Sequence, residues 1–433
     1  MIISKVKRIW EDIDYPFLYD SFNKDIYVKQ ITEIIIYGIK NIKEGDVVGV
    51  IGDFNAESIA TLLRLFEKKA IVVPLTKETY SQHSYFIKEA KCQYVFNQNK
   101  LTKTISSKQY KDSFLDNLRL SGNAGLILFT TGTTGRPKAI LHNLETFLKR
   151  YDTPKPPLKA LSFLLFDHIG GINTILHMLF NRGQVVCLRE RSVENVIKII
   201  KKYKIELLPT TPTFLRMLAL SPDLKNKIGD SLKIISYGTE RMDQPTLNIL
   251  IKKFPKVDFR QTYGMSELGI LRVKSENKES LFMKIGGEGI ETKIINKILY
   301  IKAQNRMLGY LNYESPFDQD GWYCTKDIVE VKNNGFIKII GRDSDLINIG
   351  GLKFMPSEVE RHCLNFPKIK YAKAIGRKNP ITGEHLELYL EAYDKDLDLK
   401  EIMIFLKNNL PSHMIPLKIV QKKLEISHRF KKL

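Results

Sequence analysis

Strand-like runs rich in β-branched residues alternate with amphipathic helical patterns over most of the chain. The first pair is VVGVIG, residues 47–52, followed by a helical pattern over residues 55–69. The alternation recurs at IVVPL, GLILFT, LSFLLF, QVVCL, ELLPT and LKIISY, each of which precedes a helical pattern. Because successive parallel strands need a crossover connection, repeated βα units predict parallel sheets covered by helices. Such sheets bind ligands in loops beyond the carboxyl ends of their strands.

The pattern changes near Gly269. From there to Gly341, short strand-like pieces separated by polar turns indicate a β-rich module. We therefore predict an α/β fold with a large N-terminal domain, residues 1–341, of βα-built sheets plus the β-rich module, and a small mobile α+β C-terminal domain, residues 342–433. The expected elements of the small domain are helices at residues 357–364 and 399–409 and strands around Ala372 and at ELYLEAY.

The chain carries a basic excess that is spread along its length. It has 433 residues, enough for two or three domains of roughly 150 residues each. Lys and Arg total 68 against 48 for Asp and Glu, which gives a net charge of +20. Such a charge raises the question of a nucleic-acid partner. Because no single arm holds the excess, we interpret it as compositional and expect no nucleic-acid partner.

Cysteine usage and apolar runs bear on the compartment. The four cysteines lie far apart with no CxxC pair, which argues against a zinc site or a disulfide framework and indicates a reducing cytoplasm. Residues 1–10 lack the apolar stretch of a signal peptide. No segment approaches the ~18 apolar residues of a membrane span, so we expect no integral membrane association.

A loop rich in Gly and Thr follows the apolar run GLILF and precedes the helix-like stretch HNLETFLKR, residues 142–150. The stretch FTTGTTGRPKAI supplies backbone N–H groups that can approach a ligand closely, hydroxyl donors and a cation, the components of a polyphosphate cradle. It is not the P-loop NTPase motif, because Pro137 rather than Gly precedes the lysine. The candidate phosphate-binding residues are Thr130, Thr131, Gly132, Thr133, Thr134, Gly135 and Lys138.

TTGTTGRPK resembles the phosphate-loop signature of the adenylate-forming superfamily, which includes acyl-CoA synthetases, peptide-synthetase adenylation domains and beetle luciferases. Three further segments resemble the motifs of this superfamily, in the same order along the chain. They are QTYGMSELG at residues 261–269, GWYCTKD at 321–327 and GRDSDLINIGGLKFMPSEVE at 341–360. The resemblance runs from about Gly45 to the end of the chain.

The resemblance implies how ATP would be bound. Tyr263, followed by Gly264, would offer its ring to adenine, and Ser266 would donate to a phosphate where the family usually has Thr. Glu267 would be the Mg²⁺ ligand, since a hard dication prefers carboxylate oxygen. The strand LKIISY is followed by the loop that would lie along adenine, Gly238, Thr239 and Glu240, in which Thr and Glu replace smaller residues.

Two charged residues would hold the ribose. Asp327 would accept hydrogen bonds from both ribose hydroxyls, a role that suits a carboxylate. Arg342 would reach the ribose or a phosphate. Lys326 stands where the family normally has Gly, and it would either add a phosphate contact or point into solvent.

The resemblance also implies a cation delivered by the small domain. A carboxylate must attack the α-phosphorus of ATP, so cations and position would do most of the catalytic work. The tail SHRFKKL supplies Lys431 as the candidate lysine and Lys432 as the reserve, although Phe430 replaces the family's Gly. For the second half-reaction the small domain would rotate about a hinge at Ser344. Gly350 and Gly351 would then line the path of a pantetheine thiol.

The segment LLFDHIGGINT corresponds to the border of the acyl pocket in the family. His168 with the two glycines that follow resembles the FHxxG pattern of acyl-CoA synthetases. A second alignment places Asp167 where amino-acid-activating domains hold the substrate ammonium. We favour the acyl alignment, because HIGG continues the match.

We therefore expect an ATP-dependent carboxylic acid:thiol ligase. It would form an acyl-adenylate, release pyrophosphate and pass the acyl group to coenzyme A or to the phosphopantetheine of an acyl or peptidyl carrier protein. One alternative is an enzyme that activates amino or hydroxy acids. Another is a basic binding protein that has lost catalysis, for which Phe430, Lys326, Ala139 and Ser344 are the departures from the family pattern.

Overall fold

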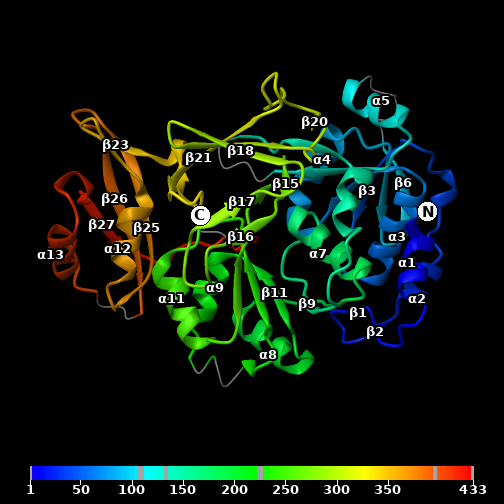
Figure 1. Ribbon diagram of the computed structural model, residues 1–433, viewed down its shortest axis with the longest axis horizontal. Helices are drawn as coiled ribbons and strands as arrows, with labels where there is room; N and C mark the ends of the chain where they lie inside the picture. Colours follow the sequence, from blue (N-terminus) through cyan, green and yellow to red (C-terminus); the bar gives the residue numbers. More distant parts are fainter. Residues whose placement is uncertain are drawn as a thin grey trace.

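The computed structural model describes residues 2–104, 112–130, 135–222, 224, 228–393 and 397–430. Helices and sheets are both present (Figure 1), so the α/β prediction is confirmed. The first large sheet has seven strands in the order β20-β8-β7-β4-β3-β5-β6, and β3, β4, β5 and β7 run parallel. Its strands are β3 (Val47–Ile51), β4 (Ile71–Leu75), β5 (Tyr94–Asn97), β6 (Lys100–Lys103), β7 (Gly125–Phe129), β8 (Ala139–Asn143) and β20 (Gly309–Tyr310).

The second large sheet also has seven strands, in the order β13-β12-β11-β9-β10-β1-β2, and all but β2 run parallel. Here the N-terminal segment, for which we had predicted no element, adds β1 beside β10. The strands are β1 (Leu18–Tyr19), β2 (Asp25–Ile26), β9 (Lys159–Leu161), β10 (Gln184–Val186), β11 (Leu207–Thr210), β12 (Ile234–Tyr237) and β13 (Asp258–Gln261).

Helices pack on these sheets as the βα pattern requires. In α3 and α7 nearly every side chain is buried, because one hydrophobic core joins both helices to strands of the two large sheets. The α-helices of this part are α1 (Ile2–Ile9), α2 (Val28–Glu33), α3 (Ala56–Glu67), α4 (His83–Glu89), α5 (Ser113–Leu120), α6 (Leu144–Leu148), α7 (Ile169–Phe180), α8 (Val193–Tyr203), α9 (Pro212–Ala219) and α11 (Gln244–Lys253). Short 3-10 turns are η1 (Ile39–Asn41), η2 (Lys77–Gln82) and η3 (Lys149–Tyr151).

The predicted β-rich module is a six-stranded antiparallel sheet, yellow-green in Figure 1, in the order β16-β17-β22-β21-β19-β18. A two-stranded ribbon, β14 and β15, precedes it. The strands are β14 (Gly264–Met265), β15 (Gly269–Ile270), β16 (Val273–Ser275), β17 (Met283–Ile285), β18 (Ile290–Ile295), β19 (Ile298–Ala303), β21 (Tyr323–Val331) and β22 (Ile337–Arg342).

The C-terminal α+β unit, orange and red in Figure 1, has a hydrophobic core of its own. That core begins at Ile347, shortly after β22 ends at Arg342. The boundary at residues 341 and 342 and the mobility of this unit remain predictions. Its elements are η4 (Asp343–Asp345), β23 (Ile347–Ile349), β24 (Leu352–Phe354), α12 (Pro356–Leu364), β25 (Ile369–Asn379), β26 (Gly383–Ala392), α13 (Leu399–Asn409), η5 (Ser412–Met414) and β27 (Lys418–Gln421).

Two of the predicted elements were wrong. LSFLLF was expected to be one strand, but β9 ends at Leu161, and the following residues are buried in a non-strand segment. A short apolar run is buried both as a strand and as an irregular segment, so the hydrophobic pattern could not distinguish the two. The segment after the Gly/Thr loop was expected to begin a helix at His142, yet β8 continues to Asn143 because it pairs with β7 in an antiparallel ladder.

Neither disulfides nor long apolar helices occur among the described residues. The four cysteines carry free thiols, and all but Cys324 are buried. Among residues with described coordinates, we find no helix with the length and hydropathy to cross a lipid bilayer.

Candidate active site

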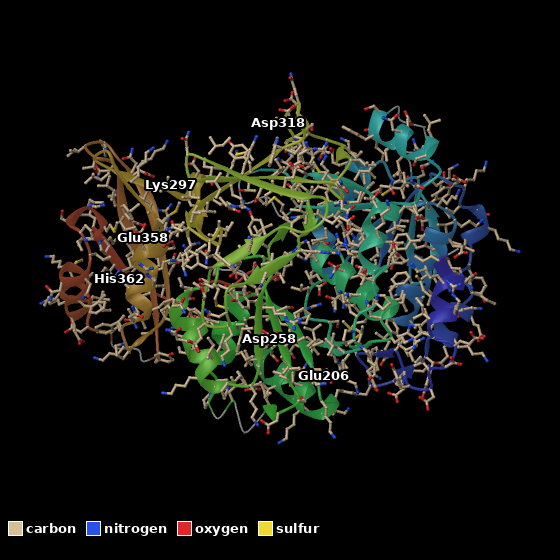
Figure 2. The ribbon with its side chains drawn as sticks, in the orientation of Figure 1. Glu206, Asp258, Lys297, Asp318, Glu358 and His362 are labelled. Carbon is tan, nitrogen blue, oxygen red and sulfur yellow. The ribbon has the colours of Figure 1, made fainter. Side chains whose placement is uncertain are left out.

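A cavity of about 620 Å³ lies between the second large sheet, the β-rich module and the C-terminal unit. Glu206 and Asp258, at the amino ends of β11 and β13, lie in the lower half of the molecule in Figure 2, and the carboxyl ends of these strands point toward its centre. The cavity has the size of a typical small-molecule site. It brings together residues from the predicted motifs and the hinge: Thr239, Glu240, Tyr263, Gly264, Asp327, Arg342 and Ser344.

The aspartate of the cavity is held by two neighbouring motifs. The Tyr263 hydroxyl donates to Asp327 Oδ2 at 2.5 Å, and Arg342 Nε lies 3.5 Å from Oδ1. Only 6% of Asp327 is exposed. Burial raises the pKa of Asp327, while the Tyr263 hydrogen bond and the Arg342 charge act in the opposite direction. The carboxylate therefore depends on these two partners to remain ionised in a desolvated place.

An irregular strand positions this aspartate. Asp327 pairs with Arg342 across β21 and β22, and the register of β21 against both of its neighbours shifts close by. Lys326, immediately before it, is exposed and has a φ of 59°, the left-handed conformation that favours glycine. Bulges of this kind re-aim side chains beside active sites. Lys326 thus adopts the backbone conformation of the glycine it replaces and points into solvent.

The loop after β12 approaches the next strand closely. A Cβ on Gly238 would lie 2.2 Å from the Oγ1 of Thr262, so no larger residue fits without a shift. Thr239 has a φ of 68° and is exposed toward the cavity. The Glu240 carboxylate accepts from the backbone N–H of Thr213 at the start of α9. The predicted adenine loop therefore lies along the cavity wall.

The two ends of the Gly/Thr loop are fixed side by side. Thr130 N–H donates to the Lys138 carbonyl, and Thr130 Oγ1 accepts from the Lys138 N–H at 3.0 Å. Gly135 is exposed. Lys138 Nζ lies over the rings of Tyr310 and Tyr313, at 4.7 and 5.1 Å from their centroids. Thr131, Gly132, Thr133 and Thr134 lie outside the described residues.

Tyr310 also joins this lysine to the predicted metal ligand. Its hydroxyl donates to Glu267 Oε1 at 2.6 Å, and Glu267 is 8% exposed. Burial and the charge of Glu267 raise the pKa of Tyr310, which therefore remains a donor. Ser266 is half-buried, and its backbone is hydrogen-bonded by the buried His142 of β8. No group of three or more metal-binding side chains occurs among the described residues.

His168 and Asp167 lie beside a second, smaller cavity. His168 is the N-cap of α7, and its Nδ1 accepts from the backbone N–H of Gly170. Asp167 is buried; its Oδ2 accepts from the hydroxyls of Thr76 and Thr79, and Arg429 Nη2 lies 3.6 Å from its Oδ1. Asp167 therefore already has a cationic partner from the C-terminal tail, a partner that our sequence analysis missed.

The remaining candidates lie in the C-terminal unit. Gly350 and Gly351, with φ of 59° and 88°, form the tight turn between β23 and β24 and are exposed. They are not among the described residues lining either cavity. Ser344 lines the large cavity, and its hydroxyl donates to Asp345. Lys431 and Lys432 lie outside the described residues.

The structure adds functional candidates that the motifs did not indicate. Tyr310, Asn312 and Tyr313 contact the base of the Gly/Thr loop: Asn312 Oδ1 accepts from the Ala139 N–H, and the Tyr313 hydroxyl donates to the Arg136 carbonyl. In the sequence, only the cluster of two tyrosines and an asparagine in GYLNY could have indicated these residues. Its contacts reach across more than 170 residues, which no local pattern reveals.

The model of the AMP-binding enzyme family matches residues 36–310, well over half of the chain. The chain belongs to this family. The adenylate-forming resemblance inferred from the four motifs is therefore confirmed.

Two curated relatives are similar over part of their length. One is 2-succinylbenzoate–CoA ligase from Staphylococcus epidermidis, 28% identical over 316 residues, which cover 69% of this chain and 65% of that protein. The other is 4-coumarate–CoA ligase-like 6 from Arabidopsis thaliana, 25% identical over 293 residues, or 60% of this chain and 51% of that protein. The aligned region thus spans less than two thirds of either relative.

Solved structures share the fold over the whole chain. The anthranilate CoA ligase AuaEII in complex with anthranoyl-AMP has a TM-score of 0.79 at 14% identity, covering 100% of this chain and 95% of that one. ATP-bound MatB from Rhodopseudomonas palustris has a TM-score of 0.78 at 18% identity, covering 99% and 97%. At such identities the likeness shows the fold.

Proposed function

We propose that this enzyme is an ATP-dependent carboxylic acid:CoA ligase that forms an acyl-adenylate and passes the acyl group to a thiol. The observation that carries the proposal is the cavity where Tyr263, Asp327 and Arg342 meet beside the adenine loop, with Lys138 and Glu267 gathered on Tyr310 nearby. We assign these groups to the ribose, the phosphates and the metal ion of bound ATP. The CoA ligase names of both curated relatives support the same reaction class.

Different side chains of the site bind different parts of the nucleotide. The Asp327 carboxylate accepts from the ribose hydroxyls, and Arg342 neutralises its charge. Tyr263 would lie along the adenine together with Thr239 and Glu240, which line the same cavity. Lys138 draws the β- and γ-phosphates, together with the hydroxyls and N–H groups of residues 130–135. Ser266 donates to a phosphate oxygen from its half-buried position.

The donor set of the site suits Mg²⁺. Mg²⁺ is commonly held by one or two carboxylates plus phosphate oxygens and water, and Glu267, buried and oriented by Tyr310, supplies one carboxylate. Bound there, the ion would neutralise phosphate charge. The site residues themselves position the triphosphate so that the acid's carboxylate oxygen attacks the α-phosphorus while the bond to pyrophosphate breaks.

The cation of the small domain completes the first half-reaction. We assign it to Lys431, with Lys432 as the reserve, because the residue before Lys431 lies on the carboxyl ends of the second large sheet. In the second half-reaction a thiolate attacks the acyl carbon and AMP leaves. Rotation at Ser344 would bring Gly350 and Gly351 to the thiol path. We propose coenzyme A as the acceptor, with the phosphopantetheine of an acyl or peptidyl carrier protein as the alternative.

Contacts at the second cavity favour an acyl substrate over an amino acid. In the amino-acid alignment Asp167 would hold the substrate ammonium, but Arg429 already lies against this carboxylate. His168 then borders the acid, as in the acyl alignment. Free, mostly buried thiols suit the reducing compartment that we propose for this enzyme, the cytoplasm.

The deciding experiment is acid-dependent exchange of labelled pyrophosphate into ATP, across fatty, aromatic and amino acids. We expect exchange with at least one carboxylic acid, and none without acid. Lys431→Ala should abolish exchange yet spare thiol transfer from a preformed adenylate. Lys432→Ala should leave both nearly unchanged, and the reverse pattern would assign the role to Lys432. Silence from folded protein across the panel, with Mg²⁺ present, would instead favour the alternative of a binding protein without catalysis.

A further inference from the structure

The second cavity adjoins the large one and lies where the acid must bind. Thr239 lines both cavities, so the two spaces meet at the loop that we assign to the nucleotide. The small cavity lies at the carboxyl ends of β9 and β11, the place where parallel sheets bind ligands. Phe163, Leu164, Leu165 and Phe430 supply the apolar part of its wall, and the polar lining includes His168, Arg191, His428 and Arg429.

One wall of this cavity comes from the C-terminal tail. Phe430 packs against Phe163 and Phe214, with ring centroids 5.1 and 5.3 Å apart. Its backbone carbonyl accepts from the buried hydroxyl of Thr211 at 2.8 Å. The buried pair of Arg429 and Asp167 fixes the preceding residue. In Figure 1 the red ribbon of this tail runs from the left-hand unit back to the green strands.

With the tail in place, the remaining space is small. The cavity measures about 20 Å³, which is room for about one water molecule. Phe430 is responsible for this, because its ring stands where the glycine of the family pattern would leave space. Its φ of 54° is the left-handed conformation that a glycine adopts without strain. Phe430 therefore adopts a backbone conformation that is strained for a residue with a side chain.

We propose that Phe430 is a specificity-determining residue that closes the acid pocket, so that this enzyme activates short, unbranched aliphatic acids of about two to three carbons. This rests on the proposed ligase function and names its substrate class. The residue comes from the small domain, so the size limit applies only while the tail is docked for adenylate formation. The acids named for the curated relatives carry an aromatic ring, which a cavity of this size does not accept.

The test measures binding of acyl-sulfamoyl-adenosines, stable mimics of the acyl-adenylate, with acetyl, butyryl, hexanoyl and octanoyl chains. Calorimetry on the full-length enzyme gives the dissociation constant of each. We expect affinity to fall by at least about tenfold from acetyl to hexanoyl, since pocket size discriminates strongly between added methylenes. Phe430→Gly should remove this fall and bind hexanoyl at least as tightly as acetyl. Phe430→Leu should be intermediate.

Glu425→Ala is the matched control, because Glu425 is exposed on the same tail and lines neither cavity. It should keep the wild-type dependence on chain length. Equal affinity of the wild type for acetyl and octanoyl mimics, or an unchanged length profile in Phe430→Gly, would overturn the size limit while leaving the ligase function intact. Failure of every mimic to bind wild type and variants alike would overturn both.

Discussion

At the scale of single residues, the ribose site that we propose depends on one buried carboxylate, Asp327. Asp327→Asn removes the charge and one acceptor while keeping the shape of the side chain. Hydrogen bonds to charged groups contribute about 1.5–3 kcal/mol each, so we expect ATP affinity to fall by roughly 10- to 100-fold. Calorimetric titration with ATP measures this. Glu330→Gln, an exposed position on the same strand, should bind ATP like the wild type.

Tyr263 controls the protonation of that carboxylate. Its hydrogen bond lowers the pKa of Asp327 against the larger effect of burial. Tyr263→Phe removes the hydrogen bond but keeps the ring, so the pKa of Asp327 should rise further. Because the neutral form accepts ribose hydroxyls poorly, ATP binding is lost as the pH falls through this pKa. The acid limb of ATP affinity against pH should therefore move to higher pH in Tyr263→Phe; an unmoved limb would contradict the assignment.

Most of these residues could be predicted, because short local motifs carry them. Tyr263, Asp327 and Arg342 come from three separate motifs, and the structure brings all three into contact. Tyr310 and Arg429 could not be predicted, since their roles arise from contacts with Glu267 and Asp167 that only the fold creates. The sequence shows which groups are available, and tertiary packing decides which of them meet.

At the scale of elements, several non-glycine residues near the site adopt left-handed backbone conformations. Lys326, Thr239 and Phe430 have φ of 59°, 68° and 54°. Each stands where the family pattern has a glycine or a smaller residue. Left-handed backbone costs a non-glycine residue roughly 1–2 kcal/mol, and such strain commonly gathers at functional sites.

Lys326→Gly should relieve this strain, because its side chain is exposed and only the backbone is fixed. We expect the free energy of unfolding to increase by up to about 1 kcal/mol, since glycine also gains freedom in the unfolded chain. Lys326→Val should lower it instead. Chemical denaturation of the two variants measures the difference. A gain in stability for Lys326→Val would refute the strain argument.

Helices and strands could be predicted where a hydrophobic pattern extends over many residues. The predictions were wrong where strand pairing determines the secondary structure. The helix over residues 399–409 was predicted at both ends because its amphipathic pattern is complete. The strand over residues 139–143 was missed, since only its antiparallel pairing with β7 distinguishes it from the start of a helix. The prediction of a strand after Leu161 was wrong for the same reason, because hydrophobicity alone does not define a strand.

At the scale of the whole molecule, the C-terminal tail connects the small domain to the second large sheet. It leaves the small domain after β27 and inserts Arg429 and Phe430 at the carboxyl ends of the second large sheet. The composition could not predict this docking, because in a chain of net charge +20 a basic tail does not differ from the many other basic segments. Its buried contacts hold the tail against the second large sheet, the arrangement that we propose for adenylate formation.

The buried pair of Arg429 and Asp167 should therefore favour one domain arrangement over the other. Both side chains are at most 10% exposed, and leaving one of them buried without its partner is costly, about 3–5 kcal/mol in comparable pairs. The small domain avoids this cost in Arg429→Ala by undocking its tail. We expect pyrophosphate exchange to fall by at least about tenfold, with thiol transfer from preformed adenylate within about twofold of wild type.

Two comparisons separate docking from general instability. Arg429→Lys keeps the charge and should recover part of the exchange rate, while the midpoint of thermal unfolding of the large domain should be the same in Arg429→Ala and wild type. Limited proteolysis should cut the tail faster in Arg429→Ala, because its buried contacts hold it only in the docked arrangement. Equal loss of exchange and thiol transfer would mean that the pair supports the fold as a whole and does not select a domain arrangement.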